Sequence, residues 1–371
     1  MESKEYQGHW WLPGEFDNRS GGVLNFHPEQ LSRLSLFSAL NTDPKYTGSD
    51  SIFTTSKIFG QTTDGSPITL LNCKRDKYNT NFTEFGRQTN SEIVASYILD
   101  GYLYENQNPA FDSLKISFPF LEDWARLNVL DQSFQTNSTG RIKPSHKMSI
   151  SYTFPEIPSG MVEDLEISLV SSGDINTTFY RSVSIDLDSY MKINPQRNRV
   201  PLSEYLDWIS KLNNFVAFAT DRPVAPEAIE GEIDGTEVNL RYPTEGIRNA
   251  GSNIHPYSFL FNYHHISLNF PDAISEWFTM SEELKPVLDL YFGTQFREDM
   301  YENNSFLSLS QAVESYHRLT RSGRYHSEYK YDEVLEYFKT FLYRNPEQIY
   351  DHSGSLKSSR SAVSGLSNLK N

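Results

Sequence analysis

The sequence predicts a protein of the α+β class, in which a β-rich, sandwich-like or barrel-like region is followed by a helical region. From about residue 8 to residue 190, short runs of β-branched and aromatic residues alternate with turn residues, and no helical period interrupts them. From Pro271 onward, apolar residues recur at steps of three and four, as amphipathic helices require. A block of strands followed by a block of helices is typical of this class.

Composition restricts the partners of the chain. With 371 residues and a formal net charge of -15, it offers no broad cationic surface, so binding to RNA or DNA is disfavoured. No run approaches the roughly 18 apolar residues of a membrane helix, and the first residues have no signal-peptide pattern, so we expect no membrane contact. The lone Cys73 cannot form an internal disulfide, and the expected compartment is the cytoplasm.

Residues 1–200 form the predicted β-rich region. Eight segments in it have the length and composition of strands, and Asp64-Gly65 between two of them is a hairpin turn signal. At this spacing they favour a largely antiparallel sandwich or barrel. These segments are residues 21–26, 51–60, 67–73, 92–104, 114–120, 147–154, 164–172 and 178–187.

Residues 201–268 are predicted to add one helix and short strands to the β-rich region. Ser203 can cap a helix that ends near Asp221, because apolar side chains recur along it at steps of three and four. Strand character returns at residues 237–242 and 256–263. We therefore expect the helix to lie against the sheets.

Residues 269–345 are predicted to be a bundle of helices joined by short connections. Residues 346–371 end in a Ser-rich stretch that cannot bury enough apolar area to offset the entropy of ordering, so we expect this tail to be disordered. The helical segments are residues 272–280, 281–292, 305–321 and 331–344.

The helix predicted at 305–321 has two faces. One is an apolar stripe, which we expect to face the bundle: Phe306, Leu309, Ala312, Val313 and Tyr316. The other is a polar strip at i, i+3, i+4 and i+7: Glu314, His317, Arg318 and Arg321. This strip is either a solvated face with weak ion pairs or a surface that binds RNA phosphate or a partner subunit.

Arg321 and His326 have four residues between them, which is the spacing of the Arg-x(4 to 6)-His motif of HEPN ribonucleases. In such a pair the Arg stabilises charge on a phosphate and the His transfers a proton. Gly323 lies between them in a stretch with the composition of a turn, which would not hold the two side chains together. They are nevertheless the catalytic candidates of this sequence.

No metal or cofactor site is expected. His264 and His265 are adjacent, so on a strand they would point to opposite faces, and no Cys or carboxylate lies nearby at ligand spacing. Nucleophile elbows and Gly-rich phosphate-binding loops are also absent from the sequence.

Trp10 and Trp11 allow two interpretations. Paired indoles can stack on sugars or nucleobases as ligand-facing aromatics, or they can pin the start of the chain onto a sheet. We favour the anchoring role.

Several stretches of the sequence resemble ApeA-type proteins of bacteria. The resemblance covers about residues 8–321 and implies a β-rich N-terminal region before a HEPN-like helical domain. It further implies a function in abortive-infection defence against phage through RNA cleavage, with the N-terminal region sensing infection. In the last stretch, the residues that match the family pattern are Gln311, Ala312, Glu314, Tyr316, His317 and Arg318. The stretches are GHWWLPGEFDNRSGGVLNF, IFGQTTDGSPITLLNC, ILDGYLYENQNPAFDSLKISFPFLEDW, EYLDWISKLNNFVAFATDRPVAPEAI and FLSLSQAVESYHR.

The sequence departs from the family pattern after this helix. The Arg-x(4 to 6)-His motif of the family lies on a later helix, whereas this chain continues through residues 343–346 into the Ser-rich tail. We therefore expect a sensor region with an incomplete HEPN-like domain, which acts by binding a phage-derived trigger or a HEPN partner, and whose expected protein partner is either a second copy of the chain or a HEPN-containing protein. Two alternatives stay open: an active HEPN endoribonuclease whose site forms across a homodimer, and a carbohydrate- or protein-binding β module outside defence.

Overall fold

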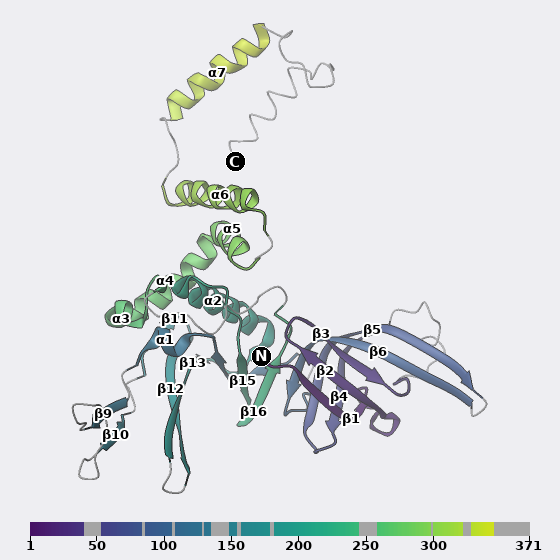
Figure 1. Cartoon of the computed structure of the whole chain (residues 1–371). Helices are drawn as coiled ribbons and strands as arrows, with labels where there is room; N and C mark the ends of the chain where they lie inside the picture. The colour runs from purple at the N-terminus through teal and green to yellow at the C-terminus, as the bar shows by residue number, and fades with distance from the viewer. Residues whose placement is uncertain are drawn as a thin grey trace. The chain divides into compact units, whose positions relative to one another are not determined.

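The computed structural model describes residues 1–40, 53–83, 86–105, 108–127, 130–134, 148–153, 157–178, 182–244, 258–297, 300–321 and 328–344. The chain divides into two compact units, Met1–Leu309 and Ser310–Asn371. The described strands belong to the first unit, together with helices α1 to α5 (Figure 1).

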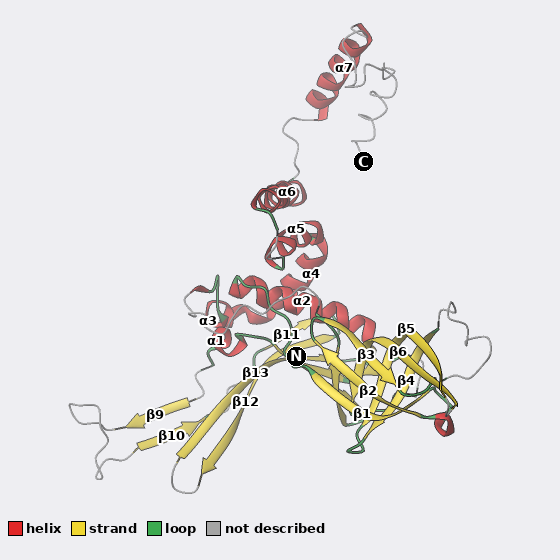
Figure 2. Cartoon of the chain, turned by 45° about the vertical axis from the view of Figure 1, so that its right-hand side comes forward, coloured by secondary structure: helices red, strands yellow, loops and turns green. Residues whose placement is uncertain are grey.

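Six strands of the first unit close into an antiparallel barrel (Figure 2). Their order around it is β6-β3-β2-β1-β4-β5, and β5 pairs back onto β6. Side chains alternate between the barrel core and the outside, as in β2, where every second residue is buried. The strands are β1 (Lys4–Trp11), β2 (Ser20–His27), β3 (Gln30–Leu36), β4 (Thr54–Thr62), β5 (Pro67–Thr83) and β6 (Gly86–Asp100).

The predicted β-rich region is confirmed, and of the two predicted architectures the structure has the barrel instead of the sandwich. Because β6 pairs with both β5 and β3, the sheet closes on itself and those edges disappear. The predicted hairpin turn joins β4 to β5. Gly65 takes a φ of 90° there, a conformation that favours glycine, and its N–H donates to the carbonyl of Thr62 at 3.0 Å.

An open sheet continues from the barrel at β6. Strand β5 pairs along the whole of β6, so β3 and β16 share its other edge, β3 at residues 91–95 and β16 at residues 98–100. From β16 the order continues β15-β8-β13-β12-β11. These strands are β8 (Ser113–Ser117), β11 (Ser159–Val162), β12 (Leu165–Thr178), β13 (Ser182–Pro195), β15 (Ala228–Ile233) and β16 (Thr236–Arg241). Two small separate sheets pair β7 (Ala110–Phe111) with β14 (Val200–Pro201), and β9 (Leu130–Phe134) with β10 (Met148–Tyr152).

Helices cover the open sheet and enclose a second core. The rings of Trp124 in α1 and Phe215 in α2 lie 5.6 Å apart, and those of Phe218 in α2 and Trp277 in α4 lie 5.7 Å apart. Strand β6 contributes to both cores, because Ile98 lies in the barrel core and the next residue, Leu99, lies in the core beneath the helices. The helices are α1 (Leu121–Ala125), α2 (Leu202–Thr220), α3 (Tyr263–Ile266), α4 (Phe270–Glu283) and α5 (Lys285–Gln295).

The helix predicted to begin at Ser203 is confirmed as α2, and its end near Asp221 is also confirmed, since Asp221 adopts the left-handed conformation that closes many helices. The predicted cap at Ser203 is wrong, because α2 begins at Leu202 and its N-cap residue is Pro201, which makes no side-chain cap hydrogen bond. The strand predicted at 256–263 is wrong for the described residues 258–263. The N–H groups of Leu260 and Phe261 donate to the carbonyl of Ala219 at 2.9 and 3.4 Å, so this segment completes the end of α2 instead of a sheet ladder.

Two further helices, α6 (Glu302–Thr320) and α7 (Glu328–Arg344), confirm the helical character predicted after Pro271. The predicted burial of the apolar stripe on α6 is wrong. Ala312 is buried, but Phe306 is 73% exposed and Val313 is 70% exposed, and Leu309 and Tyr316 are exposed as well. Among the described helices, none is both long and apolar enough to span a membrane. The tail predicted to be disordered lies outside the described residues.

Candidate functional site

The polar strip predicted on the helix at 305–321 lies on the exposed surface of α6. One guanidinium nitrogen of Arg318 lies 2.6 Å from a carboxylate oxygen of Glu314, as expected for an i, i+4 pair. Both side chains are more than half exposed, so the pair stabilises the helix by only about 0.2–0.5 kcal/mol. Gln311, Tyr316 and His317 are exposed beside this pair.

The two catalytic candidates are not brought together by the described structure. Arg321 directly follows α6, is exposed, and donates its backbone N–H to the carbonyl of His317 at 3.0 Å. His326 lies outside the described residues. The prediction of a phosphate site at this pair therefore stays a prediction.

Trp10 and Trp11 occupy the end of β1 and are buried. Trp10 has 0% of its surface exposed and lies in the barrel core, where its indole N–H donates to the carbonyl of Gly22 at 3.2 Å. Trp11 is 6% exposed and its ring packs edge-on against Phe16 at 5.1 Å. The anchoring interpretation is consistent with this burial, whereas ligand-facing indoles would need open ring faces.

The histidines near α3 have structural contacts. His265 accepts the backbone N–H of Asn262 at 3.0 Å and so caps α3, and a ring nitrogen of His264 lies 3.1 Å from the carbonyl oxygen of Arg126. Within the described ranges, three or more His, Cys, Asp or Glu side chains do not gather in an arrangement that could hold a metal ion.

A pocket of about 540 Å³ lies where the turn between β11 and β12 meets helices α2 and α4; we call it the helix–sheet pocket. Trp208 from α2 and Phe278 from α4 give it aromatic walls, and Ser275 and Thr279 line it from α4. Strand β11 and α4 approach closely beside it, because a Cβ atom on Gly160 would lie 2.9 Å from the Cα atom of Pro271. The pocket therefore borders a tight contact between sheet and helix.

Two cations in the helix–sheet pocket each bridge two carboxylates. Arg197 pairs with Asp164 at 3.2 Å and also with Glu204. Lys211 on α2 pairs with Asp207 on the same helix at 3.0 Å and with Glu282 on α4 at 2.8 Å. These contacts tie the sheet to α2 and α2 to α4.

Lys211 is the most protected of these charges, with 13% of its side chain exposed. Burial lowers the pKa of its ammonium group, but the hydrogen bonds to Glu282 and Asp207 outweigh burial and hold the pKa above its usual value. Its nitrogen also lies 5.5 Å from the ring centroid of Phe278, within the range of a cation–π contact. The link between α2 and α4 is thus charged at neutral pH.

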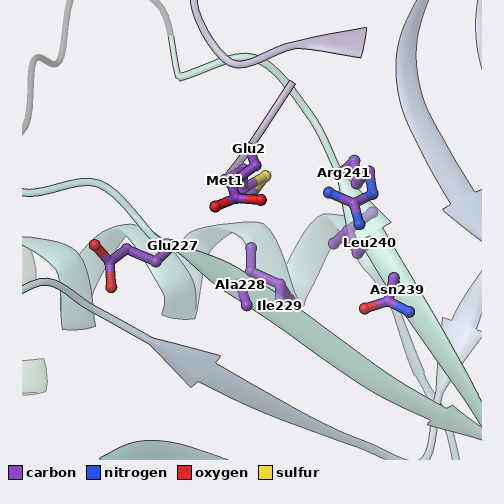
Figure 3. Close-up of a pocket in the computed structure, with 8 residues that line it drawn as sticks. All are labelled: Met1, Glu2, Glu227, Ala228, Ile229, Asn239, Leu240 and Arg241. Carbon is purple, nitrogen blue, oxygen red and sulfur yellow. The ribbon is translucent and has the colours of Figure 1, made fainter. Parts of the chain in front are cut away.

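A second pocket, of about 500 Å³, lies beside β15 and β16, close to where the open sheet joins the barrel; we call it the junction pocket (Figure 3). Its lining includes the guanidinium of Arg241, the amide of Asn239 and the carboxylates of Glu2 and Glu227. Such a mixture of charges suits a small polar or zwitterionic group better than an apolar ligand.

Arg241 connects the junction pocket to a buried carboxylate. Asp100 ends β6 and is 7% exposed; one of its oxygens accepts the hydroxyl of Tyr6 at 2.7 Å and the ammonium of Lys4 at 3.0 Å, and lies 3.6 Å from Arg241. Burial, together with the bond to Asp100, raises the pKa of the Tyr6 hydroxyl. The cluster joins β1, β6 and β16, and it therefore links the barrel to the open sheet through polar contacts.

Sequence reasoning missed the residues of both pockets. A signal existed on the helix predicted from Ser203, where Glu204, Asp207 and Lys211 recur at i, i+3 and i+7. Arg241 also falls in the predicted strand at 237–242, and a charged side chain that is buried in a sheet requires an oppositely charged or hydrogen-bonding partner. The partners Glu282 and Asp100 are distant in sequence, and no local pattern connects them.

The comparisons with known proteins give one match. A family model, ApeA N-terminal domain 1, matches residues 5–277, which is more than half of the chain. This range runs from β1 into α4 and so includes the barrel, the open sheet and the helices that cover it. No curated protein and no solved structure matches the chain.

Proposed function

The chain belongs to the ApeA N-terminal domain 1 family, and from this we propose that it acts in anti-phage defence as a recognition module. Membership of this family indicates a function in defence against phage for the family as a whole. The sensing role, the phage-derived trigger and the HEPN-containing partner are our proposals for this chain.

The observation that carries the proposal is the position of the helix–sheet pocket. Its walls come from the edge of the open sheet, from α2 and from α4, and the matched family region ends inside α4. A polypeptide segment that enters this pocket with a basic side chain would compete with Lys211 for Glu282 and would press on Phe278. Either effect changes how α4 sits on α2, and α4 leads directly into α5.

In the proposed mechanism, the trigger therefore binds at the edge of the open sheet, and its binding releases α4 from α2. In the unbound chain, the bridge from Lys211 to Glu282 and the N–H of Trp277, which donates to the carbonyl of Lys211 at 2.8 Å, hold α4 on α2. A trigger with a basic side chain would find the carboxylates of Glu163, Glu204 and Glu282 around two aromatic walls. A shift of α4 would then be passed to the helical segment that follows and to a partner bound there.

A plaque assay with a matched pair of variants tests the proposal. Thr279→Arg places a long cationic side chain in the helix–sheet pocket without touching the core, since Thr279 is exposed and lines the pocket. Met280→Arg, at the next position of the same helix, is 42% exposed and does not line the pocket. Bacteria that produce the chain should resist a set of phages; Thr279→Arg should abolish this resistance, and Met280→Arg should keep it.

Two outcomes would count against the proposal. Resistance that survives Thr279→Arg at equal protein levels would exclude the pocket as the recognition site. Purified protein that degrades total RNA, and loses that activity on His326→Ala, would instead favour the ribonuclease alternative, whose catalytic pair is Arg321 and His326.

A further inference from the structure

The junction pocket is built on one face of β16. Side chains alternate along a strand, so Asn239 and Arg241 lie on the same face and both line the pocket, whereas Leu240 between them is buried in the core beneath the helices. On the neighbouring strand β15, Ala228 also lines the pocket. The volume of about 500 Å³ is that of a small-molecule site. The pocket can therefore take a small ligand whose polar groups are directed at β16.

The positive charge of Arg241 is only partly compensated. One oxygen of Asp100 serves two cations, because it accepts the ammonium of Lys4 at 3.0 Å and lies 3.6 Å from Nε of Arg241. Among the described residues, no other carboxylate lies within ion-pair distance of Arg241, and its buried Nε has no hydrogen-bond partner. Since Lys4 and Arg241 share the single negative charge of Asp100, one positive charge stays uncompensated at the pocket.

Water screens this charge only weakly. The side chain of Arg241 is 19% exposed, and the ring of Phe26 lies 5.7 Å from its Cζ on the barrel side. A guanidinium presents a planar fork of N–H donors that matches a carboxylate, and the amide of Asn239 adds a further donor beside it. This end of the pocket therefore suits an anionic group of a ligand.

The other end of the pocket is acidic. Figure 3 draws the carboxylate of Glu227 at the end opposite the guanidinium of Arg241. Glu2 contributes a second carboxylate to the lining. Within the part of the chain that the structure describes, neither Glu227 nor Glu2 forms an ion pair. The pocket therefore presents charged donors at one end and charged acceptors at the other, with a gap between them.

We propose that the junction pocket binds a short zwitterion that carries a carboxylate at one end and an ammonium group at the other, as a dipeptide does. The ligand carboxylate accepts hydrogen bonds from the guanidinium of Arg241 and the amide of Asn239, and the ligand ammonium donates to Glu227. A simple anion would meet the repulsion of Glu227 and Glu2, and a simple cation that of Arg241. An α-amino acid carries both charged groups on one carbon, so it reaches only one end.

This ligand site is independent of the proposed function, because the junction pocket and the helix–sheet pocket share no residue. Loss of phage resistance on Thr279→Arg would leave it unaffected. Its own consequence is a change in stability. Because the ligand compensates the charge of Arg241 in the folded chain only, it should raise the Tm of the chain by mass action.

Titration calorimetry of the full chain with five small probes tests the proposal. Diglycine and 6-aminohexanoate carry separated charges, and each should bind with a Kd at or below about 1 mM and raise the Tm. Glycine, hexanoate and hexylamine each lack one of the two contacts, so each should bind at least about tenfold more weakly. If hexanoate binds as tightly as 6-aminohexanoate, or if neither zwitterion binds at 10 mM, the proposal is overturned.

Three variants locate the ligand in the junction pocket. Arg241→Met and Glu227→Gln should each raise the Kd for diglycine at least about tenfold. Glu230→Gln is the matched control on β15, because Glu230 is exposed, lies opposite Asn239, pairs with Lys115 at 3.9 Å and does not line the pocket. It should leave the Kd within about threefold of the wild type.

The test does not depend on the stability of the Arg241 variant. Glu227 is exposed and forms no ion pair among the described residues, so Glu227→Gln should fold as the wild type does even where Arg241→Met does not. Diglycine that binds Glu227→Gln as tightly as the wild type, or that loses affinity equally on Glu230→Gln, would place the zwitterion outside this pocket and overturn the proposal.

Discussion

Gly60 and Trp10 give the sharpest test of the barrel. They are directly opposite each other in β4 and β1, and the indole of Trp10 lies over the glycine. A Cβ atom on Gly60 would lie 2.3 Å from two ring carbons of Trp10. Carbon atoms pack best at about 3.5–4.0 Å, so Gly60→Ala creates an overlap of more than about 1 Å.

The indole has little freedom to move away from such an overlap. Trp10 is fully buried and its N–H is bound to the carbonyl of Gly22. Overpacking of a core costs about 1–3 kcal/mol, and a rigid ring that is held on both sides belongs at the upper end of that range. Loss of glycine entropy in the unfolded chain returns about 0.5 kcal/mol. We therefore expect a net destabilisation of about 2 kcal/mol, or about 3 °C in Tm for a cooperative unit of the size of Met1–Leu309.

Calorimetry and urea unfolding of four variants measure this effect: Gly60→Ala, Trp10→Phe, the two combined, and Gly21→Ala. Gly21→Ala is the matched control in β2, because its Cβ would approach only the ring of Phe37, which is 66% exposed and free to shift. Trp10→Phe combined with Gly60→Ala should recover at least about 1 kcal/mol relative to the sum of the single changes. If Gly60→Ala is no less stable than Gly21→Ala, or if the cycle gives no coupling, the packing of β1 on β4 described above is wrong.

Two further predictions concern Glu122 and α6. Burial raises the pKa of the Glu122 carboxyl above its usual value of 4.5. Between that value and the raised pKa, the folded chain retains a proton that the unfolded chain releases. The contribution of Glu122 to the free energy of unfolding therefore falls as the pH rises through the raised pKa. Glu122→Gln still accepts the N–H of Ser189, so in urea unfolding it should gain stability over the wild type between pH 4.5 and neutral and match it at lower pH; a constant difference at all pH values would contradict this. Arg318→Ala removes a pair that is 71% and 62% exposed, so the free energy of unfolding should change by less than about 0.5 kcal/mol, and a loss above about 1 kcal/mol would mean that α6 is covered.

The local elements of the fold were predictable because local patterns encode them. The helix from Ser203 was visible in its apolar spacing, and the turn at Asp64-Gly65 was visible in its residue types, since a φ of 90° is accessible to glycine without strain. Strand β1 was not predicted as a strand, because GHWW does not alternate in polarity; only the anchoring role of Trp10 and Trp11 was predicted. The segment at 258–263 has the composition of a strand, but two of its N–H groups donate to the carbonyl of Ala219 at the end of α2 instead of to a neighbouring strand.

Closure of the barrel and the composition of the pockets were not predictable, because both depend on contacts between residues far apart in sequence. The alternation of β5 and β6 is the same in a sandwich and in a barrel, and only the pairing of β6 with β3 distinguishes them. Lys211 and Glu282 are linked across 71 positions, and Arg241 and Asp100 lie on strands that meet only in the folded sheet. The burial predicted for the apolar stripe of α6 was wrong for a different reason. The spacing of its apolar residues predicts a helix, but it does not determine whether another element covers that face of the helix.

The shared strand β6 constrains how the family can diverge. Ile98 and Leu99 are consecutive, yet one belongs to the barrel core and the other to the core beneath the helices. Insertion or deletion of one residue in this part of β6 would exchange the two faces and place both side chains in the wrong core at the same time. Length changes among natural relatives should therefore accumulate toward the ends of β5 and β6 that lie far from Asp100, while β6 near Asp100 should keep its length even where its residues change.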